Sequence, residues 1–265
     1  MTPLGDVAPL AGATPPAPSP MQSPTTLAER LALIRQRIAA AADRAGRDPA
    51  TVELMAVTKN HPAETVAEAV ALGLDLMGEN RIQEAKAKIP LCPARARWHF
   101  IGHLQSNKAR DAAALFQVIQ GIDSLAIATE LDKQAAKLGR RLGILLEVNV
   151  AGESSKFGWN PEAAVEAIPA LNALGRLDLL GLMTVAPYAT DAEKVRPVFR
   201  RLRELRARCE DRLGAPMPVL SMGMSGDLEV AIEEGSTLVR VGTALFGARP
   251  SLLRKTEPND EAGIA

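Results

Sequence analysis

A lysine at the end of an apolar run is the first residue in this sequence whose position suggests chemistry. Lys59 follows the run 53–58 in the stretch LMAVTKNHP, residues 54–62. An amine that is partly removed from water holds its proton less tightly, and the neutral amine is the form that attacks a carbonyl carbon to make an imine. A lysine at a strand end is also commonly solvated or ion-paired, so this residue alone leaves both interpretations open.

Two glycine-rich stretches each place a hydroxyl residue where a helix is expected to begin. They are GMSGD, which contains Ser225, and RVGT, which contains Gly242 and Thr243. Free backbone N–H groups and the positive end of a helix dipole favour an anion such as phosphate at these positions. Simple N-capping by Ser225 and Thr243 uses the same donors, and we expect it as well.

Lys59, this phosphate cradle and Arg240 together supply an amine, an anion site and a cation, which are the groups needed to hold pyridoxal phosphate. Lys156, in the stretch ESSKFG, is a second amine and the main rival to Lys59. Because Lys156 falls in a loop rich in glycine and serine, we expect its amine to be better hydrated and harder to deprotonate.

The remaining titratable residues suggest weaker sites. His99 and His103 are four residues apart but straddle a strand end, and no glutamate completes an H-E-x-x-H pattern, so we expect no zinc site. Two carboxylate pairs resemble acid and base partners, namely Glu79 with Glu84 and Asp227 with Glu229. Carboxylates that stabilise the starts of helices explain both pairs more simply.

Short apolar runs alternate with longer segments of helical periodicity after Pro49, and this alternation predicts the elements that position these side chains. The predicted strands are 53–58, 75–78, 97–101, 117–120, 143–150, 177–184, 218–222 and 238–241. The predicted helices include 62–72, 80–89, 124–138, 161–173, 191–213 and 226–234. Eight strand–helix units with parallel pairing fit a closed (β/α)8 barrel of the TIM type. An open doubly wound sheet is the alternative, although no G-x-G-x-x-G follows the first strand.

The polar clusters fall at one end of these predicted strands. In a (β/α)8 barrel the loops after the C-terminal strand ends form the active face. The clusters described above, and the stretch GEN at 78–80, all follow strands in this way. Turn and cap residues alone would be expected at both strand ends, so the clustering favours a binding site on this face.

The two ends of the sequence differ from the barrel. Residues 25–44 place apolar side chains at helical spacing, which predicts an added amphipathic N-terminal helix that packs on the barrel. Residues 1–24 are rich in proline and contain no Lys or Arg, so we expect a disordered tail and no secretory signal. We expect a single barrel domain over residues 25–250 and a flexible C-terminal tail over residues 251–265.

The composition excludes several classes of partner. Lys plus Arg and Asp plus Glu both total 31, so no excess of positive charge attracts nucleic acid or an anionic membrane. Charged residues interrupt the apolar runs well before the roughly 18 residues that a membrane span needs. Cys92 and Cys209 lie far apart and in no metal-like spacing, which indicates a reducing compartment. We therefore expect a cytoplasmic protein without nucleic-acid, membrane or metal partners.

Five long motifs occur in the order AVTKNHP, GENRIQEAKAK, WHFIGHLQSNKAR, GLMTVAP and LSMGMSGDLEVAIEEGSTLVRVGTALFGAR. Together they resemble the motifs of the pyridoxal phosphate homeostasis proteins, the YggS-like group. The resemblance runs from about Leu27 to Arg249. It implies a single (β/α)8 barrel like the N-terminal domain of bacterial alanine racemase, with pyridoxal phosphate held as an internal aldimine.

The resemblance also implies a role for each matching residue. Lys59 matches the Schiff-base lysine, and Asn80 matches a residue that lies against the cofactor ring. Arg240 matches the arginine that faces the pyridine nitrogen; because arginine keeps its proton, the ring nitrogen stays unprotonated and the ring is a poorer electron sink. The phosphate cradle is matched by Ser225, Gly242 and Thr243.

Three positions depart from the family pattern. Arg81 stands where the family has tyrosine, His103 stands where it has proline, and Gly226 replaces a more usual Asp or Ser. The first two affect the edge of the cofactor ring and the loop after the third strand. None of the three removes a group that the imine or the phosphate needs.

The resemblance implies a non-catalytic carrier that buffers pyridoxal phosphate and delivers it to apoenzymes, and an amino-acid racemase is the alternative. A phosphate-ligand barrel without the cofactor is a third interpretation. Racemases supply a second base as a tyrosine from an additional domain of a partner subunit. This sequence has one tyrosine, Tyr188, and ends shortly after the eighth predicted strand, so we expect a monomeric carrier without turnover. Because a second amine speeds imine exchange, we expect Lys156 to assist transfer of the cofactor.

Overall fold

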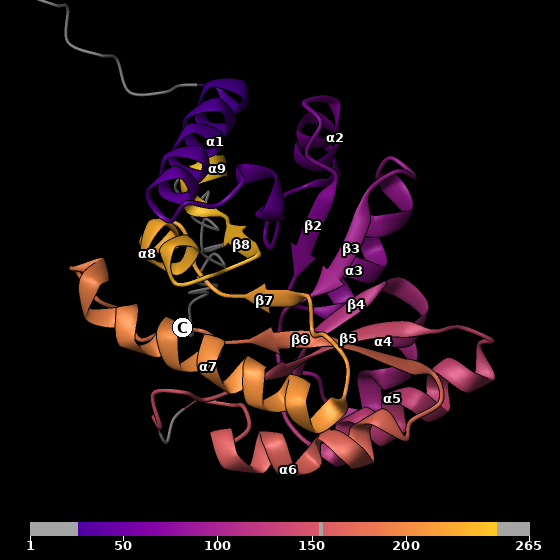
Figure 1. Cartoon of the computed structure of the whole chain (residues 1–265). Helices are drawn as coiled ribbons and strands as arrows, with labels where there is room; N and C mark the ends of the chain where they lie inside the picture. The colour runs from indigo at the N-terminus through magenta and orange to yellow at the C-terminus, as the bar shows by residue number, and fades with distance from the viewer. Residues whose placement is uncertain (1–25, 154–155, 248–265) are drawn as a thin grey trace, which may run out of the picture.

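Eight parallel strands close into one barrel, and the helices surround it (Figure 1). The computed structural model describes residues 26–153 and 156–247. The strands are β1 (Glu53–Val57), β2 (Leu76–Glu79), β3 (Arg97–Phe100), β4 (Val118–Ile122), β5 (Leu142–Glu147), β6 (Leu177–Met183), β7 (Val219–Ser221) and β8 (Leu238–Val241). Each pairs in parallel with the next, and β8 pairs with β1. The predicted (β/α)8 barrel is confirmed, and an open doubly wound sheet is excluded.

The helices lie where the periodicity predicts them, with one clear shift. They are α1 (Leu27–Arg44), α2 (Ala63–Ala71), α3 (Ile82–Lys88), α4 (Ala109–Leu115), α5 (Leu125–Lys137), α6 (Pro161–Asn172), α7 (Arg196–Leu213), α8 (Leu228–Glu233) and α9 (Thr243–Phe246). The helix predicted over 191–213 begins only at Arg196, after a 3₁₀ turn at Ala192–Val195. Pro197 lacks the N–H that an interior helical position needs, so the first turn of α7 is the position that accommodates it without loss of a hydrogen bond.

The strand predicted over 143–150 is also shorter than expected. β5 ends at Glu147, and Val148 forms only an isolated bridge with Trp159. The N–H groups of Asn149 and Trp159 bond the carbonyls of Trp159 and Glu147. The chain after β5 therefore pairs with its own loop, and this loop carries Lys156 onto the barrel mouth.

The predicted N-terminal helix is present as α1, and Figure 1 shows it beside α8 and α9. A capping box starts α1, because Thr26 accepts the N–H of Glu29 and Glu29 accepts the N–H of Thr26. The buried face consists of Leu27, Leu31, Ile34, Ile38, Ala41 and Ala42. Across the interface, Arg37 of α1 pairs with Glu229 of α8 at 2.6 Å. The amphipathic pattern thus predicted both the helix and its contact with the barrel.

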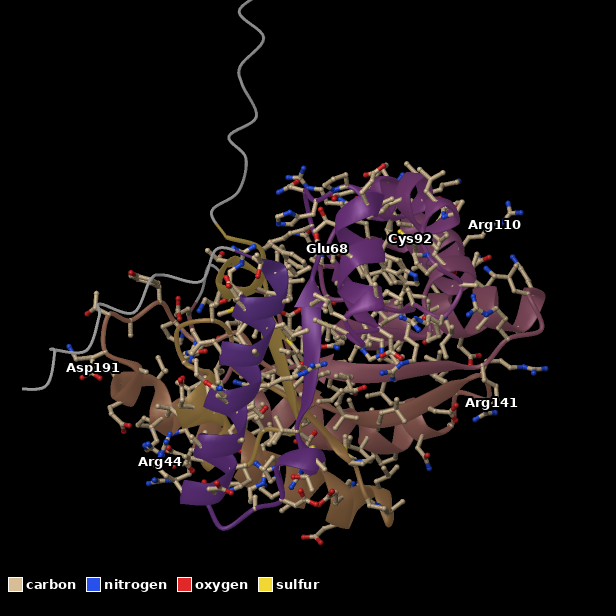
Figure 2. The ribbon with its side chains drawn as sticks, turned by 90° about the horizontal axis from the view of Figure 1, so that it is seen from above. Arg44, Glu68, Cys92, Arg110, Arg141 and Asp191 are labelled. Carbon is tan, nitrogen blue, oxygen red and sulfur yellow. The ribbon has the colours of Figure 1, made fainter. Side chains whose placement is uncertain are left out.

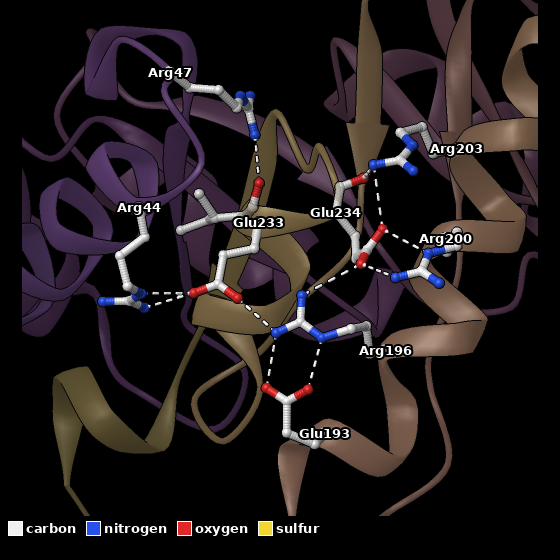
Figure 3. A network of polar contacts seen from close by, with 9 residues as sticks. Arg44, Arg47, Glu193, Arg196, Arg200, Arg203, Glu233 and Glu234 are labelled. Carbon is white, nitrogen blue, oxygen red and sulfur yellow. Dashed lines mark hydrogen bonds and ion pairs between the residues drawn. The ribbon is translucent and has the colours of Figure 1, made fainter.

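Helices α7 and α8 are joined by a network of arginines and glutamates (Figure 3). Glu234, only 5% exposed, pairs with Arg196, Arg200 and Arg203 at 3.3, 3.0 and 3.2 Å. Arg196 also contacts Glu193 and Glu233, each at 2.6 Å. Burial alone raises the pKa of the Glu234 carboxyl, but hydrogen bonds from Arg200 and Arg196 outweigh burial and hold that pKa below its ordinary value. The carboxylate of Glu234 therefore contacts three guanidinium groups and balances part of their charge, and Glu193 and Glu233 share in balancing Arg196.

Replacing Glu234 with glutamine removes that balancing charge while keeping the side-chain size. We expect the free energy of unfolding at neutral pH to fall by about 2 kcal/mol, below the cost of breaking a fully buried pair because Arg200 and Arg203 are half exposed. Because the folded pKa of Glu234 is lowered, the wild-type advantage is present above the ordinary carboxyl pKa of about 4.3 and is lost as the pH falls below it. Urea unfolding at several pH values measures this difference.

The control for that measurement is Glu68→Gln. Glu68 lies on α2 with an exposed side chain and is labelled in Figure 2. A change within about 0.5 kcal/mol is expected for such a surface substitution. Equal effects of the two substitutions would show that the network contributes nothing specific.

Other predictions about the chain stand as follows. Residues 1–24 and 251–265, predicted as tails, lie outside the described residues. Cys92 is partly buried and Cys209 is buried, and both thiols are free. Among the helices of the described segments, none is both long and apolar enough to cross a membrane.

Candidate functional site

A cavity of about 760 Å³ opens at the C-terminal ends of the strands. Its walls come from the segments that follow β1, β2, β3, β5, β6, β7 and β8. All the residues that the sequence singled out for cofactor binding or transfer line this one cavity, namely Lys59, Asn80, Lys156, Ser225, Arg240, Gly242 and Thr243. The barrel thus brings together side chains that are up to 184 positions apart in the sequence, from Lys59 to Thr243.

Lys59 lies in a turn and not at the strand end where the sequence suggested it. β1 ends at Val57, and the N–H of His61 bonds the carbonyl of Thr58 at 3.0 Å. Asn60 has a φ of 62°, the left-handed conformation that asparagine tolerates and that a type II turn needs at its third position. Lys59 is the second residue of this turn, and its side chain is half-buried where the turn enters the cavity.

Asn80 directly follows β2 and faces the loop after β3. A Cβ atom on Gly102 would lie 2.5 Å from the carbonyl oxygen of Asn80, so only glycine permits this close approach of the two loops. Both residues line the cavity. Asn80 of the GEN motif and Gly102 of the GHLQ stretch therefore lie in close contact in the wall of the cavity that Lys59 also lines.

Arg240 is buried in the barrel, with 4% of its surface exposed, and reaches the cavity from β8. Its guanidinium donates to the carbonyl and hydroxyl oxygens of Ser221 at 2.9 and 2.6 Å, and to the carbonyl of Thr184 at 2.8 Å. These partners are neutral, and burial lowers the pKa of Arg240 to about 10. The carbonyl and hydroxyl dipoles of Ser221 and Thr184 therefore orient the guanidinium of Arg240. Among the described residues, no carboxylate is hydrogen-bonded to it.

A chain of hydrogen bonds continues from Arg240 across the barrel interior. The hydroxyl of Ser221 donates to Oε1 of Gln120 at 2.7 Å, and Nε2 of Gln120 lies 3.0 Å from Nδ1 of His99. Burial lowers the pKa of His99 to about 4, so the ring is neutral at neutral pH. Its Nδ1 accepts a hydrogen bond from the side-chain amide of Gln120. Each hydrogen bond in the series from Arg240 to His99 is thus donated in the direction away from Arg240. This common direction fixes the orientation of the Ser221 hydroxyl and the Gln120 amide.

The two glycine–hydroxyl loops meet at the cavity, but their hydroxyl residues do not cap the helices that follow them. The N-cap of α8 is Asp227 and the N-cap of α9 is Gly242, so the expected N-capping by Ser225 and Thr243 is wrong. The hydroxyl of Ser225 instead accepts the N–H of Ala244, 3.3 Å away in α9. Ser225 and Thr243 thus line the same cavity, and the Ser225 hydroxyl joins the first of these loops to the first turn of α9.

Lys156 lies on the same cavity from the loop after β5. Its ammonium pairs with Oε1 of Glu153 at 2.8 Å and lies 3.3 Å from the carbonyl oxygen of Val185, with 27% of the side chain exposed. The two lysines thus approach the cavity from different strands. Lys156 is held at the rim by an ion pair and a carbonyl oxygen.

The histidines and the carboxylates take other roles. His99 lies inside the barrel, whereas Nδ1 of His103 pairs with Asp123 at 2.9 Å and its ring stacks on Phe157 at 3.9 Å. Over the described residues, no group of three or more His, Cys, Asp or Glu side chains is arranged to hold a metal. Asp227 and Glu229 do begin α8, as expected. The interpretation of Glu79 as a helix-start carboxylate is wrong, because Glu79 is fully buried at the end of β2 and pairs with Lys88 at 2.8 Å.

One wall of the cavity was not predicted. The segment after β6 lines it with apolar side chains, namely Val185, Ala186, Pro187, Tyr188, Ala189, Ala192 and Val195. The MTVAP stretch marked where this wall begins, but small apolar residues carry no chemical signature of a site. Their contribution depends on which way the loop turns, and this is decided by the packing of α7 against the barrel.

The chain matches known proteins along most of its length. Residues 30–250 match the family described as alanine racemase, N-terminal domain. The chain is 46% identical over 226 residues to the pyridoxal phosphate homeostasis protein of Pseudomonas aeruginosa, covering 85% of this chain and 96% of that protein. It is 43% identical over 222 residues to the protein of the same name from Aquifex aeolicus, covering 83% and 97%.

Solved structures agree with this match. PipY of Synechococcus elongatus, in a structure with PLP bound, superimposes with a TM-score of 0.74 at 39% identity, covering 84% of this chain and all of that chain. An alanine racemase of Clostridium difficile superimposes with a TM-score of 0.65 at 18% identity, covering 84% of this chain and 58% of that chain. At this identity the racemase supports the barrel fold and nothing further.

Proposed function

The chain belongs to the pyridoxal phosphate homeostasis protein family, and we propose that it binds pyridoxal phosphate in the cavity described above and serves the homeostasis of this cofactor. We further propose that Lys59 holds the cofactor as a Schiff base. The protein then buffers the cofactor or delivers it to apoenzymes without turning over a substrate. The bound cofactor would supply an electrophilic aldehyde carbon. An amino-acid racemase that uses the same cofactor is the alternative.

The observation that carries this proposal is the set of groups that meet in one cavity. Lys59 offers an amine, Ser225 and Thr243 offer hydroxyl groups at a glycine-rich corner, and Arg240 offers a buried positive charge. Gly226 and Gly242 line the same corner without side chains, so backbone groups there are open to a bound anion. The donor set therefore fits an aldehyde that carries a phosphate, with Asn80 beside Lys59 to contact the ring.

The arrangement favours a carrier over a racemase. Racemisation needs a second base opposite the lysine, and the tyrosine type that racemases use occurs once in this sequence, at position 188. Tyr188 lies in the cavity wall but is 94% exposed, so few packing contacts restrain its side chain as a positioned base would need. A fixed guanidinium at Arg240 also disfavours a protonated ring nitrogen, which carbanion chemistry on this cofactor exploits.

The experiment that tests the proposal has two arms. In the first, the purified protein is titrated with pyridoxal phosphate, and an imine absorption near the violet edge of the spectrum is expected. In the second, the loaded protein is incubated with L-alanine, and chiral analysis of the amino acid is expected to show no conversion to the D form. Conversion at a rate comparable to that of a working racemase would replace the carrier by the alternative.

The transfer of pyridoxal phosphate from Lys59 to an apoenzyme is expected to depend on Lys156. The neutral amine of Lys156 would add to the imine carbon, and the C=N bond to Lys59 would be replaced by one to Lys156, with two protons passing from the entering to the leaving nitrogen so that Lys59 departs as a free amine. Lys156→Ala is therefore expected to slow transfer to an apoenzyme while leaving the imine band in place. Reactivation of an added apoenzyme over time measures this transfer, and an unchanged rate would remove Lys156 from the mechanism.

Three further statements belong to the same proposal. We propose that the functional unit is one barrel domain over residues 25–250, that it acts as a monomer, and that it works in the cytoplasm. The two distant free cysteines, Cys92 and Cys209, are consistent with a reducing compartment. The mass of the loaded protein in solution tests the monomeric state.

A further inference from the structure

A buried lysine lies behind the turn that carries Lys59. Lys88, the last residue of α3, has 7% of its side chain exposed. Its ammonium donates to the carbonyl oxygen of Thr58 at 2.8 Å, to Oε1 of Glu79 at 2.8 Å and to Oε1 of Glu84 at 2.7 Å. These three acceptors match the three protons of an ammonium group. Lys88 is thus fully hydrogen-bonded, and one of its three partners is the residue that precedes Lys59.

Glu84 holds the other side of the same turn. Its Oε1 accepts the backbone N–H of Asn60 at 2.6 Å, in addition to the proton from Lys88. The backbone is therefore fixed on both sides of Lys59, at the carbonyl of Thr58 and at the amide of Asn60. The hydroxyl of Thr58 adds a further bond to Glu79 at 2.6 Å. Two side chains of α3 thus hold a turn whose middle residue has the positive φ that side chains rarely adopt.

We propose that Glu84 and Lys88 are positioning residues that hold the turn of residues 58–61 and so fix the direction in which Lys59 enters the cavity. This inference rests on the proposed role of Lys59 in binding the cofactor. An amine that is held in one orientation loses little conformational freedom when it forms a bond, so the cofactor is retained more strongly. A loosened turn would let Lys59 sample other orientations and release the cofactor faster.

The surroundings of the pair support a role beyond general stability. Oε2 of Glu79 is buried with no hydrogen-bond partner in the described part of the chain, and burial raises the pKa of this carboxyl. An apolar packing of similar volume often stabilises a fold as well as a buried ion pair does. Glu84 and Lys88 nevertheless bond the two peptide units that flank Lys59, at the N–H of Asn60 and the carbonyl of Thr58. A positioning role requires this placement.

Two substitutions of Glu84 separate positioning from charge and from folding. Glu84→Gln keeps an oxygen that can accept from Asn60 and Lys88, whereas Glu84→Ala removes both hydrogen bonds. Glu84→Ala leaves one proton of Lys88 without this acceptor, but Lys88 keeps its bonds to Thr58 and Glu79 and the exposed Asn60 can bond water, so both proteins are expected to fold. Glu68→Ala on the surface of α2 is the control for the loss of one carboxylate.

The first measurement needs no cofactor. Trace acetylation of the apo-protein with acetic anhydride over a range of pH, followed by mass spectrometry, gives the reactivity of Lys59 relative to the exposed Lys137 of α5 in the same molecule. In Glu84→Ala we expect the pH profile of Lys59 to move toward that of Lys137. In Glu84→Gln and Glu68→Ala we expect the wild-type profile.

The second measurement is the rate at which loaded protein loses pyridoxal phosphate. We expect Glu84→Ala to release it about tenfold faster, the effect of one hydrogen bond of ordinary net strength, and Glu84→Gln to stay near the wild-type rate. Wild-type profiles and rates in Glu84→Ala would overturn the inference. A wild-type protein that forms no imine would instead defeat the proposed function, while the acetylation profiles would still report on the turn.

Discussion

The Lys59→Ala protein is expected to show no imine band when it is titrated with pyridoxal phosphate. Formation of the imine joins an amine nitrogen to the aldehyde carbon and releases the aldehyde oxygen as water, so removal of that amine removes the band entirely. The remaining groups of the cavity, including Ser225 and Thr243 of the phosphate corner, are unaltered and can still hold the anion. We therefore expect weak, non-covalent binding that dialysis reverses, in a protein whose unfolding midpoint is unchanged.

Chemical reduction locates the lysine that forms the imine. Borohydride converts the imine to a stable secondary amine, and trypsin then fails to cut after the modified residue. In wild-type protein we expect the label on the uncut peptide of residues 48–81, which contains Lys59 as its one internal lysine. Lys156→Ala is the matched control and should keep both band and label. A full band in Lys59→Ala, with the label on the peptide of residues 142–176, would transfer the role to Lys156.

Replacing Arg240 with glutamine is expected to weaken the binding of pyridoxal phosphate by between about tenfold and a hundredfold. A hydrogen bond or ion pair to a charged group contributes about 1.5–3 kcal/mol, and the guanidinium of Arg240 lies where little water weakens its field. Its bonds to Ser221 and Thr184 involve neutral oxygens, so the guanidinium keeps its charge, and in the proposed site it would donate to the unprotonated ring nitrogen. Titration followed by absorbance measures the affinity of both proteins.

The stability of the apo-protein distinguishes a ligand-binding role from a structural one. The amide of glutamine can still donate to two of the oxygens that Arg240 bonds, and the cost of burying a cation disappears. We therefore expect the free energy of unfolding without cofactor to change by less than about 2 kcal/mol. Arg110→Gln, at an exposed arginine that projects from the outer edge of the molecule in Figure 2, should change neither quantity. Unchanged affinity in Arg240→Gln would place the ligand away from the barrel floor.

The alternation of apolar runs and helical segments was sufficient to predict the barrel. Parallel strands that are buried on both faces appear as short apolar runs, and the helices between them show the 3.6-residue period, so the pattern is local. The boundaries were less predictable. α7 begins at Arg196 because Pro197 must stand in a first turn, and β5 ends at Glu147 because the next residues pair with their own loop.

The parts of the candidate site built from residue types with few common roles could be predicted. The parts built from residue types that occur in any hydrophobic core were missed. A strand-end lysine, a buried arginine and glycine–hydroxyl loops are each uncommon, and together they predicted one end of the barrel. The apolar wall from Val185 to Val195 went unpredicted because alanine and valine are equally common in any core. The sequence suggested Glu79 and Glu84 only as an acid–base pair or as helix-start carboxylates. It gave Lys88 no role, since sequence spacing does not reveal that Lys88 turns inward onto the carbonyl of Thr58.

The sequence by itself determined the barrel and the types of group at its mouth. Strand and helix periods and glycine-rich turns can be recognised within short stretches of neighbouring residues. Only the tertiary structure decided which of those groups share one cavity and how each is held. Lys59 was first of interest as the end of a strand, but it lies in a turn held by side chains from α3. Contacts between distant segments depend on the closure of the barrel, and closure is a property of all eight strands together.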